Sequence, residues 1–159
     1  MKKSLLFIVS FFTAGLTHAQ QYNLLIGTYT NKGNSDGIYV YSFDTKTGES
    51  KLKSAVKTAN PSFLTVSKDQ KFVYTVNETG KNSELSAFSF NALSGNLTFL
   101  NKQLTEGGDP CYILADDKNI FTANYSGGSI SVFSRKEDGS LNKISQLIQH
   151  QSKEAGAQQ

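Results

Sequence analysis

Hydrophobic and polar residues alternate in short runs over most of this chain, and turn-forming residues separate the runs. The run ELSAFSF (84–90) alternates strictly, and KFVYTVNE (71–78) is rich in β-branched and aromatic residues. Both patterns are typical of strands. After residue 20, no apolar period of three to four residues extends over a useful length. The pattern therefore predicts an all-β fold.

The predicted strands fall into units of similar layout. The second unit has strands at 62–67, 71–78, 84–90 and 97–104, and the third has strands at 111–115, 120–125, 129–133 and 141–148. The first unit begins at 22–30 and continues at 37–43, so it lacks an opening strand. The prediction is a series of four-stranded antiparallel sheets with an incomplete first member.

The units are copies of one another. Pro61, Asn77, Phe90 and Gly95 recur 43 to 49 residues later as Pro110, Asn124, Phe133 and Gly139. Phe43 and Gly48 stand 47 residues before Phe90 and Gly95. A period of this length with several strands per unit is the signature of β-propeller blades. A ring needs at least four blades, and this chain holds about three.

The absence of an opening strand in the first unit also fits a propeller. Propellers often close by letting one chain end complete the blade begun by the other, which removes unpaired sheet edges. We therefore expect residues 20–150 to form part of a propeller. The remaining blades of a longer chain, or another copy, would be needed to close it. Residues 151–159 are small and polar and predict a loop or disordered tail.

The first 19 residues have the layout of a secretory signal peptide. Lys2 and Lys3 precede an apolar run from Leu5 to Leu16, and small residues at Thr17 and Ala19 suit a cleavage site before Gln20. The run is too short to span a bilayer. We expect the chain to be exported, either to a periplasm or out of the cell, with no membrane attachment after cleavage.

Charge and cysteine content narrow the function classes. Without the first 19 residues, the chain has 14 basic and 13 acidic residues. This nearly neutral balance lacks the excess of positive charge that nucleic-acid binding needs. The single cysteine, Cys111, excludes a disulfide framework and precedes an apolar run, so we expect it to be a buried small hydrophobe. One histidine, His150, remains, which makes a metal site improbable. We expect no metal and no cofactor.

Blade geometry predicts which polar residues meet. Loops between the second and third strands and linkers between blades emerge at the same end of every blade. Candidate substrate-binding residues at this end are Thr28, Tyr29, Asn77, Asn124 and Tyr125. An amide at a channel mouth can bind sugar hydroxyls, but asparagine also closes turns for backbone reasons. Tyr125 could equally pack against the turn at 127–128.

Glu78 and His150 are the candidate catalytic residues at this end. A carboxylate in a cleft can act as general base toward water. The alternatives are a solvated loop charge for Glu78 and an ordinary polar residue for His150. The charged turns at 68–71 and 116–119, together with Arg135, are expected at the opposite end.

Several segments together resemble the N-terminal part of the lactonase family, which includes the propeller-type 6-phosphogluconolactonases. The segments, in chain order, are IGTYT…GIYVYSFDTKTGE, PSFLTVSKDQKFVYTVNE, GGDPCYI and ANYSGGSISVF. The resemblance covers residues 22–150. It implies a seven-bladed propeller of more than twice this length that hydrolyses a sugar lactone such as 6-phosphogluconolactone.

The resemblance also bears on the site residues. Gln149 and His150 match a Gln-His pair that follows the family's third blade, and the family's His-x-His element and later Arg and Glu positions would lie beyond it. An exported protein could take a lactone that is not phosphorylated. Two alternatives are a non-catalytic propeller that binds a ligand or a protein partner, and a partial propeller that is not stably folded alone.

Overall fold

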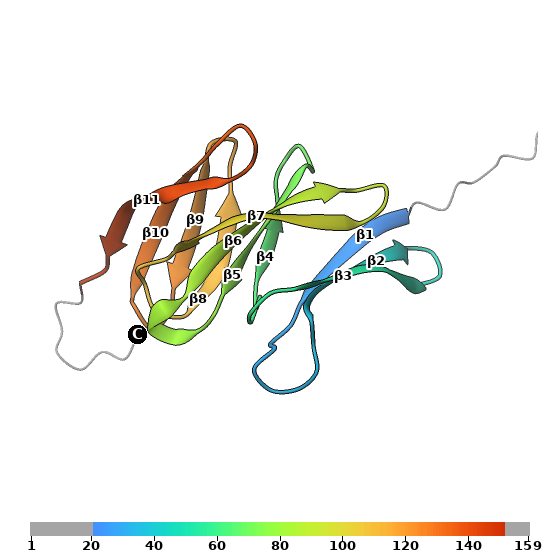
Figure 1. The fold of residues 1–159 in the computed structure, drawn as a ribbon, viewed down its shortest axis with the longest axis horizontal. Coiled ribbons are helices and arrows are strands. Elements are labelled where there is room, and N and C mark those ends of the chain that lie inside the picture. Colours follow the sequence, from blue (N-terminus) through green and yellow to red (C-terminus); the bar gives the residue numbers. More distant parts are fainter. Residues whose placement is uncertain (1–20, 152–159) are drawn as a thin grey trace, which may run out of the picture.

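The computed structural model of this protein describes residues 21–151. The predicted signal peptide at 1–19 and all of the predicted tail except Gln151 lie outside these residues. The described chain forms three antiparallel sheets that follow one another in chain order, from β1 to β11 (Figure 1). The predicted all-β fold of repeated antiparallel sheets is confirmed.

The first sheet has three strands, and the other two have four. The first contains, in spatial order, β1 (Gln21–Gly27), β2 (Gly37–Asp44) and β3 (Ser50–Lys57). The second contains β4 (Leu64–Val66), β5 (Phe72–Asn77), β6 (Glu84–Asn91) and β7 (Asn96–Leu104), and a 3₁₀ turn, η1 (Gly80–Asn82), joins β5 to β6. The third contains β8 (Pro110–Ala115), β9 (Asn119–Asn124), β10 (Ser129–Arg135) and β11 (Leu141–Gln149).

The register of the sheets repeats as the sequence does. Tyr41 pairs with Leu24 in the first sheet, and Phe88 pairs with Val73 at the equivalent place in the second. The last strand of each of these two sheets bulges at the same place, so that Tyr41 lies opposite Leu52 and Phe88 lies opposite Phe99. Each sheet is therefore a structural copy of its neighbour, as the sequence period predicts.

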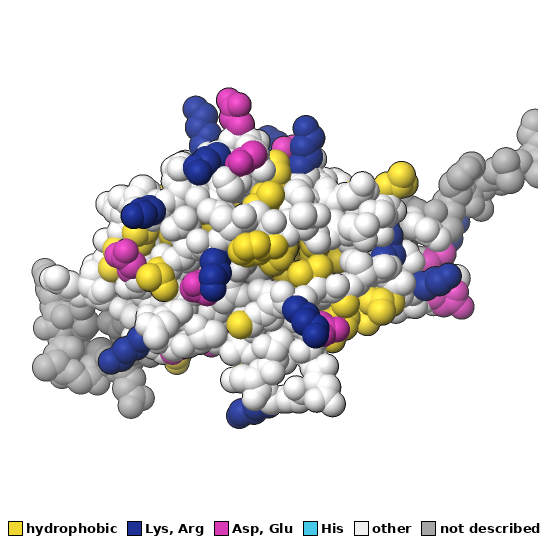
Figure 2. Space-filling model, viewed as in Figure 1, with side chains coloured by type: hydrophobic (Ala, Val, Ile, Leu, Met, Phe, Trp, Pro, Cys, Tyr) yellow, Lys and Arg dark blue, Asp and Glu magenta, His cyan; other side chains and the backbone are white. Residues whose placement is uncertain are grey.

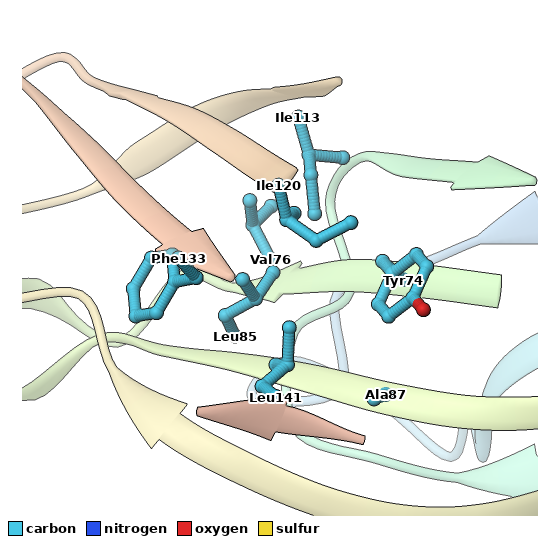
Figure 3. Packing of buried hydrophobic residues seen from close by; sticks show 8 residues of the cluster. All are labelled: Tyr74, Val76, Leu85, Ala87, Ile113, Ile120, Phe133 and Leu141. Atoms are coloured by element: carbon cyan, nitrogen blue, oxygen red, sulfur yellow. The ribbon is translucent and has the colours of Figure 1, made fainter. Parts of the chain in front are cut away.

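The second sheet is buried on both faces, which explains why its strands are rich in apolar residues. Tyr74, Val76, Leu85 and Ala87 face the third sheet and form one core with Ile113, Ile120, Phe133 and Leu141 (Figure 3). Residues of the other parity face the first sheet and form a second core, composed of Val73, Phe88 and Leu97 with Ile38 and Val40. The second sheet thus joins two cores.

The two outer sheets leave one face open. Alternate residues of β1, namely Tyr22, Leu24 and Ile26, are 39–49% exposed. On the third sheet, Leu114, Ile130 and Ile148 are 44–48% exposed. Figure 2 shows hydrophobic side chains open to solvent, while Lys, Arg, Asp and Glu side chains gather at the upper edge of the view. Apolar residues that are buried in the central sheet are thus exposed at equivalent places on the outer sheets.

The prediction that Cys111 is buried was wrong. Its side chain is exposed on β8, and its only recorded partner in the described chain is the carbonyl of Ala123, 3.8 Å from Sγ. A bulge between Pro110 and Tyr112 places Cys111 on the open side of the third sheet. The apolar run that follows Cys111 predicted burial because strands of such composition are usually covered on both faces.

Candidate functional site

Two sets of connections meet at one end of the three sheets. The loops after β1, β5 and β9 contact the linkers that lead from one sheet to the next. Backbone hydrogen bonds join them: Thr58 donates to Asp36, Asp109 to Gly80, and Gly127 to Gly108, with N···O distances of 3.0, 3.4 and 3.2 Å. The geometry expected from the blade repeat therefore holds, and the candidate residues lie on connected segments.

Tyr29 and Glu78 form the most direct side-chain contact at this end. The Tyr29 hydroxyl donates a hydrogen bond of 2.6 Å to Oε2 of Glu78, across the boundary between the first and second sheets. The bond to the carboxylate is the main cause that raises the pKa of Tyr29 above its ordinary value, and desolvation and the charges of Glu78 and Asp109 add to it. Tyr29, which was predicted to bind substrate, is thus hydrogen-bonded to Glu78, which was predicted to be catalytic.

Tyr29, Glu78 and Tyr125 occupy corresponding places in the three sheets. Each follows the end of its sheet's β1, β5 or β9 strand by one or two residues. Tyr29 and Tyr125 are 52% and 68% exposed, and Glu78 is half-buried. An accessible phenol bonded to a carboxylate can contact a sugar ring through hydrogen bonds and stacking.

Asn77 and Asn124 do not reach solvent, because each is only 2% exposed. The Asn77 amide donates to Oγ1 of Thr58 at 2.9 Å and to the carbonyl of Ala59 at 2.6 Å, and its Oδ1 accepts from Ser86 at 2.6 Å. The bonds therefore tie β5 to the linker before β4. They support the structural alternative for Asn77.

The Asn124 amide is used in the same way. It donates to the hydroxyls of Ser129 and Ser131 at 3.0 and 2.8 Å, and Ser131 in turn donates to the carbonyl of Thr105. Neither asparagine has a positive φ, and both end strands within the sheets. Thr28 stands at the corresponding place in the first sheet, where its hydroxyl donates to the Gly37 carbonyl at 2.8 Å and also contacts the Ser35 hydroxyl.

His150 lies apart from Glu78. It follows β11, is exposed, and its backbone N–H donates to the carbonyl of Gly128 at 2.9 Å. Its ring borders an open hollow of about 560 Å³ on the free face of the third sheet, together with Cys111, Tyr125 and Ile130. Within residues 21–151, the structure brings Tyr29 to Glu78 and Tyr125 to the neighbourhood of His150, but no hydrogen bond joins the two catalytic candidates.

Two further residues at this end, Asn60 and Asp109, were not among the site residues predicted from the sequence. Asn60 and Asp109 each precede the proline that opens a sheet, and both have left-handed backbones, with φ of 40° and 49°. Asp109 accepts a hydrogen bond from Ser126 at 2.6 Å, and its carbonyl accepts one from the Tyr125 N–H at 2.9 Å. The signal that could have found them is the repeated Asx-Pro pair.

A further polar side chain at this end is Ser62, in the linker that leads to β4. Its hydroxyl oxygen is fully buried and has no hydrogen-bond partner within the described chain. A nearby Ser62 hydroxyl nevertheless lowers the pKa of Tyr29 slightly against the larger effect of Glu78.

Arg135 lies at the opposite end, as predicted. Its guanidinium donates to the carbonyl of Asp117 at 2.9 Å and lies 5.2 Å from the centre of the Phe72 ring. Asp69 is 3.9 Å away. The turns predicted to carry solvated charge surround it, so this end has the composition of a solvated surface.

Residues 21–151 contain no group of three or more His, Cys, Asp or Glu side chains arranged to hold a metal ion. They also contain no helix long and apolar enough to cross a membrane.

The repeated sheets and the shared loop end define a β-propeller. Residues 23–159 match the family model described as lactonase, 7-bladed beta-propeller. The chain therefore belongs to the lactonase family of seven-bladed β-propellers, which confirms the resemblance and the fold class predicted from the sequence.

Relatives with assigned names agree with this family. The 6-phosphogluconolactonase of Bacillus subtilis is 42% identical over 119 residues, a match that covers 73% of this chain and 34% of the relative. The 6-phosphogluconolactonase of Formosa agariphila is 34% identical over 130 residues, covering 79% of this chain and 37% of the relative. This chain spans about a third of the length of the curated relatives that it matches.

Solved structures show the same partial overlap. A candidate 6-phosphogluconolactonase from Bacteroides fragilis is 48% identical with a TM-score of 0.82, covering 86% of this chain and 38% of that chain. The periplasmic gluconolactonase of Pseudomonas aeruginosa is 38% identical with a TM-score of 0.77, covering 83% of this chain and 39% of that one. These propellers share the arrangement of the three sheets described above.

Proposed function

We propose that this chain contributes to a propeller that hydrolyses the ester bond of a sugar lactone and releases the aldonic acid. The Tyr29–Glu78 hydrogen bond carries the proposal, because it fixes a carboxylate at the loop end of the sheets. The names of the relatives support the substrate class. Carboxylates held in this way are common general bases.

The proposed reaction is water attack on the lactone carbonyl. Glu78 takes a proton from water as the water oxygen bonds to the carbonyl carbon. The tetrahedral intermediate then collapses, the bond from this carbon to the ring oxygen breaks, and the ring oxygen gains a proton. His150 is proposed as the group that supplies this proton, since a histidine can act as general acid near neutral pH.

Tyr29 and Tyr125 are proposed to contact the sugar, because both rings are accessible and follow the first- and third-sheet strands that correspond to the strand before Glu78. Thr28, Asn77 and Asn124 remain proposed members of the site. We propose that they contribute indirectly, by holding the strand ends in place. The hydrogen bonds of the two buried asparagines support this indirect contribution.

Further sheets outside residues 21–151 are proposed to cover the two open faces, either from the rest of a longer chain or from another copy. The apolar residues exposed on β1 and on the third sheet support this proposal. We also propose that residues 1–19 direct export. The periplasmic location named for the Pseudomonas aeruginosa relative agrees with such a destination.

The test is lactone hydrolysis by the purified chain, measured above the spontaneous rate with glucono-δ-lactone and with its 6-phosphate. We expect Glu78→Gln to lower kcat/KM by roughly a hundredfold to ten-thousandfold, as the loss of a general base does. Glu84→Gln is the matched control, because Glu84 lies on β6 and its carboxylate is paired with Nζ of Lys102 on β7 at 2.9 Å. Background rates from protein that circular dichroism shows to be folded would contradict catalysis by this chain and support a binding role.

A further inference from the structure

Asn60 sits in the linker between the first and second sheets and is only 6% exposed. Its backbone has φ of 40°, in the left-handed region that asparagine adopts more readily than most residues. A buried polar side chain has to find hydrogen-bond partners within the protein. The partners of Asn60 lie on both sides of the Tyr29–Glu78 contact.

The side-chain oxygen of Asn60 holds the loop that carries Tyr29. Oδ1 accepts from the backbone N–H of Thr30 at 2.9 Å and of Asn31 at 3.1 Å. It also accepts from the Thr30 hydroxyl at 3.2 Å, and that hydroxyl accepts from the Asn60 N–H at 3.2 Å. These four bonds fix the two residues that directly follow Tyr29.

The rest of Asn60 holds the backbone of Glu78. Its side-chain nitrogen donates to the Glu78 carbonyl at 2.9 Å, and its own carbonyl accepts from the Glu78 N–H at 3.1 Å. Both backbone polar groups of Glu78 are therefore bonded to the same residue. One side chain thus connects the two segments whose side chains meet at 2.6 Å.

We propose that Asn60 is a positioning residue that sets the Tyr29 hydroxyl against the Glu78 carboxylate and so holds the base in place. This inference rests on the lactonase function proposed above. Asp109 stands at the same place in the next linker and shares the left-handed backbone, but its carboxylate bonds to the Ser126 hydroxyl. Asp109 therefore provides a natural comparison within the same chain.

The experiment compares Asn60→Gly with Asp109→Gly in the full chain. Glycine accepts the left-handed backbone at both places, so each change removes only a side chain. We expect Asn60→Gly to lower kcat/KM for glucono-δ-lactone roughly tenfold to a hundredfold, because small displacements of a reacting group have effects of this size. Asp109→Gly should stay within about threefold. In a Glu78→Gln background, Asn60→Gly should have little further effect, since residues that act through one group are not additive.

A second readout does not depend on catalysis. The Tyr29 phenol titrates at raised pH because of its bond to Glu78, and ultraviolet absorbance reports this titration when Tyr29→Phe is the reference. Asn60→Gly should return the Tyr29 pKa toward its ordinary value. Asn60→Ser also removes the carboxamide that bonds Thr30, Asn31 and Glu78 and adds no charge near the phenol, so it should do the same if the glycine variant fails to fold.

The two readouts separate the two proposals. If the chain hydrolyses neither lactone, the proposed function fails while the Tyr29 titration still tests Asn60. An unchanged Tyr29 titration in a folded Asn60 variant would overturn the positioning role. Equal losses of activity in the Asn60 and Asp109 variants would overturn it as well, because a general effect of the linkers on folding would then account for both.

Discussion

Gly139 shows how closely the second and third sheets approach at the level of single residues. Its backbone has φ of 86°, and a Cβ added there would lie 2.1 Å from two ring carbons of Phe72. The Gly139 carbonyl accepts a hydrogen bond of 2.9 Å from the hydroxyl of Tyr74. Burial raises the pKa of Tyr74 to about 12. The turn at Gly139 therefore serves the interface between the sheets as well as its own hairpin.

Gly139→Ala should destabilise the chain more than Gly48→Ala. Both glycines have positive φ, but a Cβ at Gly48 would have no atom within 4 Å. The backbone change costs about 1–2 kcal/mol at either position, and the clash at Gly139 adds about 1–3 kcal/mol. Urea unfolding of the two variants checks this difference. Equal losses of unfolding free energy would mean that Phe72 moves aside at no cost.

At the scale of elements, the same strand position has different surroundings in different sheets. Leu85 on β6 is fully buried between the second and third sheets, whereas Ile130, at the corresponding position on β10, is 44% exposed. Each residue follows the first paired residue of its strand. The contribution of a side chain to stability is therefore set by whether a sheet covers its face.

Leu85→Ala should lower the free energy of unfolding by about 2–5 kcal/mol, the usual range for a buried leucine. Ile130→Ala should lower it by no more than about 1 kcal/mol, because truncating a half-exposed side chain removes less contact. Chemical denaturation of the two variants measures both values. A large loss at Ile130 would show that the open face of the third sheet is covered in solution.

Most strands could be predicted from the sequence because alternation and composition agree. β6 was predicted as 84–90 and is observed as Glu84–Asn91, and β5 and β10 differ from their predictions by one or two residues at an end. β3 was not predicted, since its sequence SKLKSAVK mixes three apolar residues with lysines and serines at the edge of the first sheet. Edge strands often contain charged residues, which weakens their apolar signal.

The candidate site could be predicted only in part. Blade geometry places Tyr29 and Glu78 at one end, but the bond between them depends on side-chain directions that no repeat specifies. The buried partners of Asn77 come from Thr58 and Ser86, residues that are unremarkable in the sequence. The exposure of Cys111 depends on what covers the third sheet, which composition does not reveal.

At the scale of the whole molecule, stability should decline from the centre outward. The second sheet contacts both cores, while the first and third each contact one. In arrays of stacked units, each unit is stabilised mainly by its neighbours. The central sheet should therefore be the last to open.

Hydrogen exchange of the intact chain checks this gradient. Amides of β5 and β6 should exchange most slowly, because these strands are buried within the central sheet. Amides of β11 should exchange much faster, since nearly all of this strand is exposed. Uniform exchange across the three sheets would indicate that the described chain opens as a single unit.

The loops at the candidate site lie outside the sheet register, and this has a consequence for how such proteins diverge. The loop after β1 covers residues 28–36, whereas the loop after β9 covers only residues 125–128. These lengths differ although the strands beneath them pair in the same antiparallel order. Insertions at this end can therefore accumulate during evolution without any cost to the cores, so new substrate preferences are expected to arise through loop length before any strand changes.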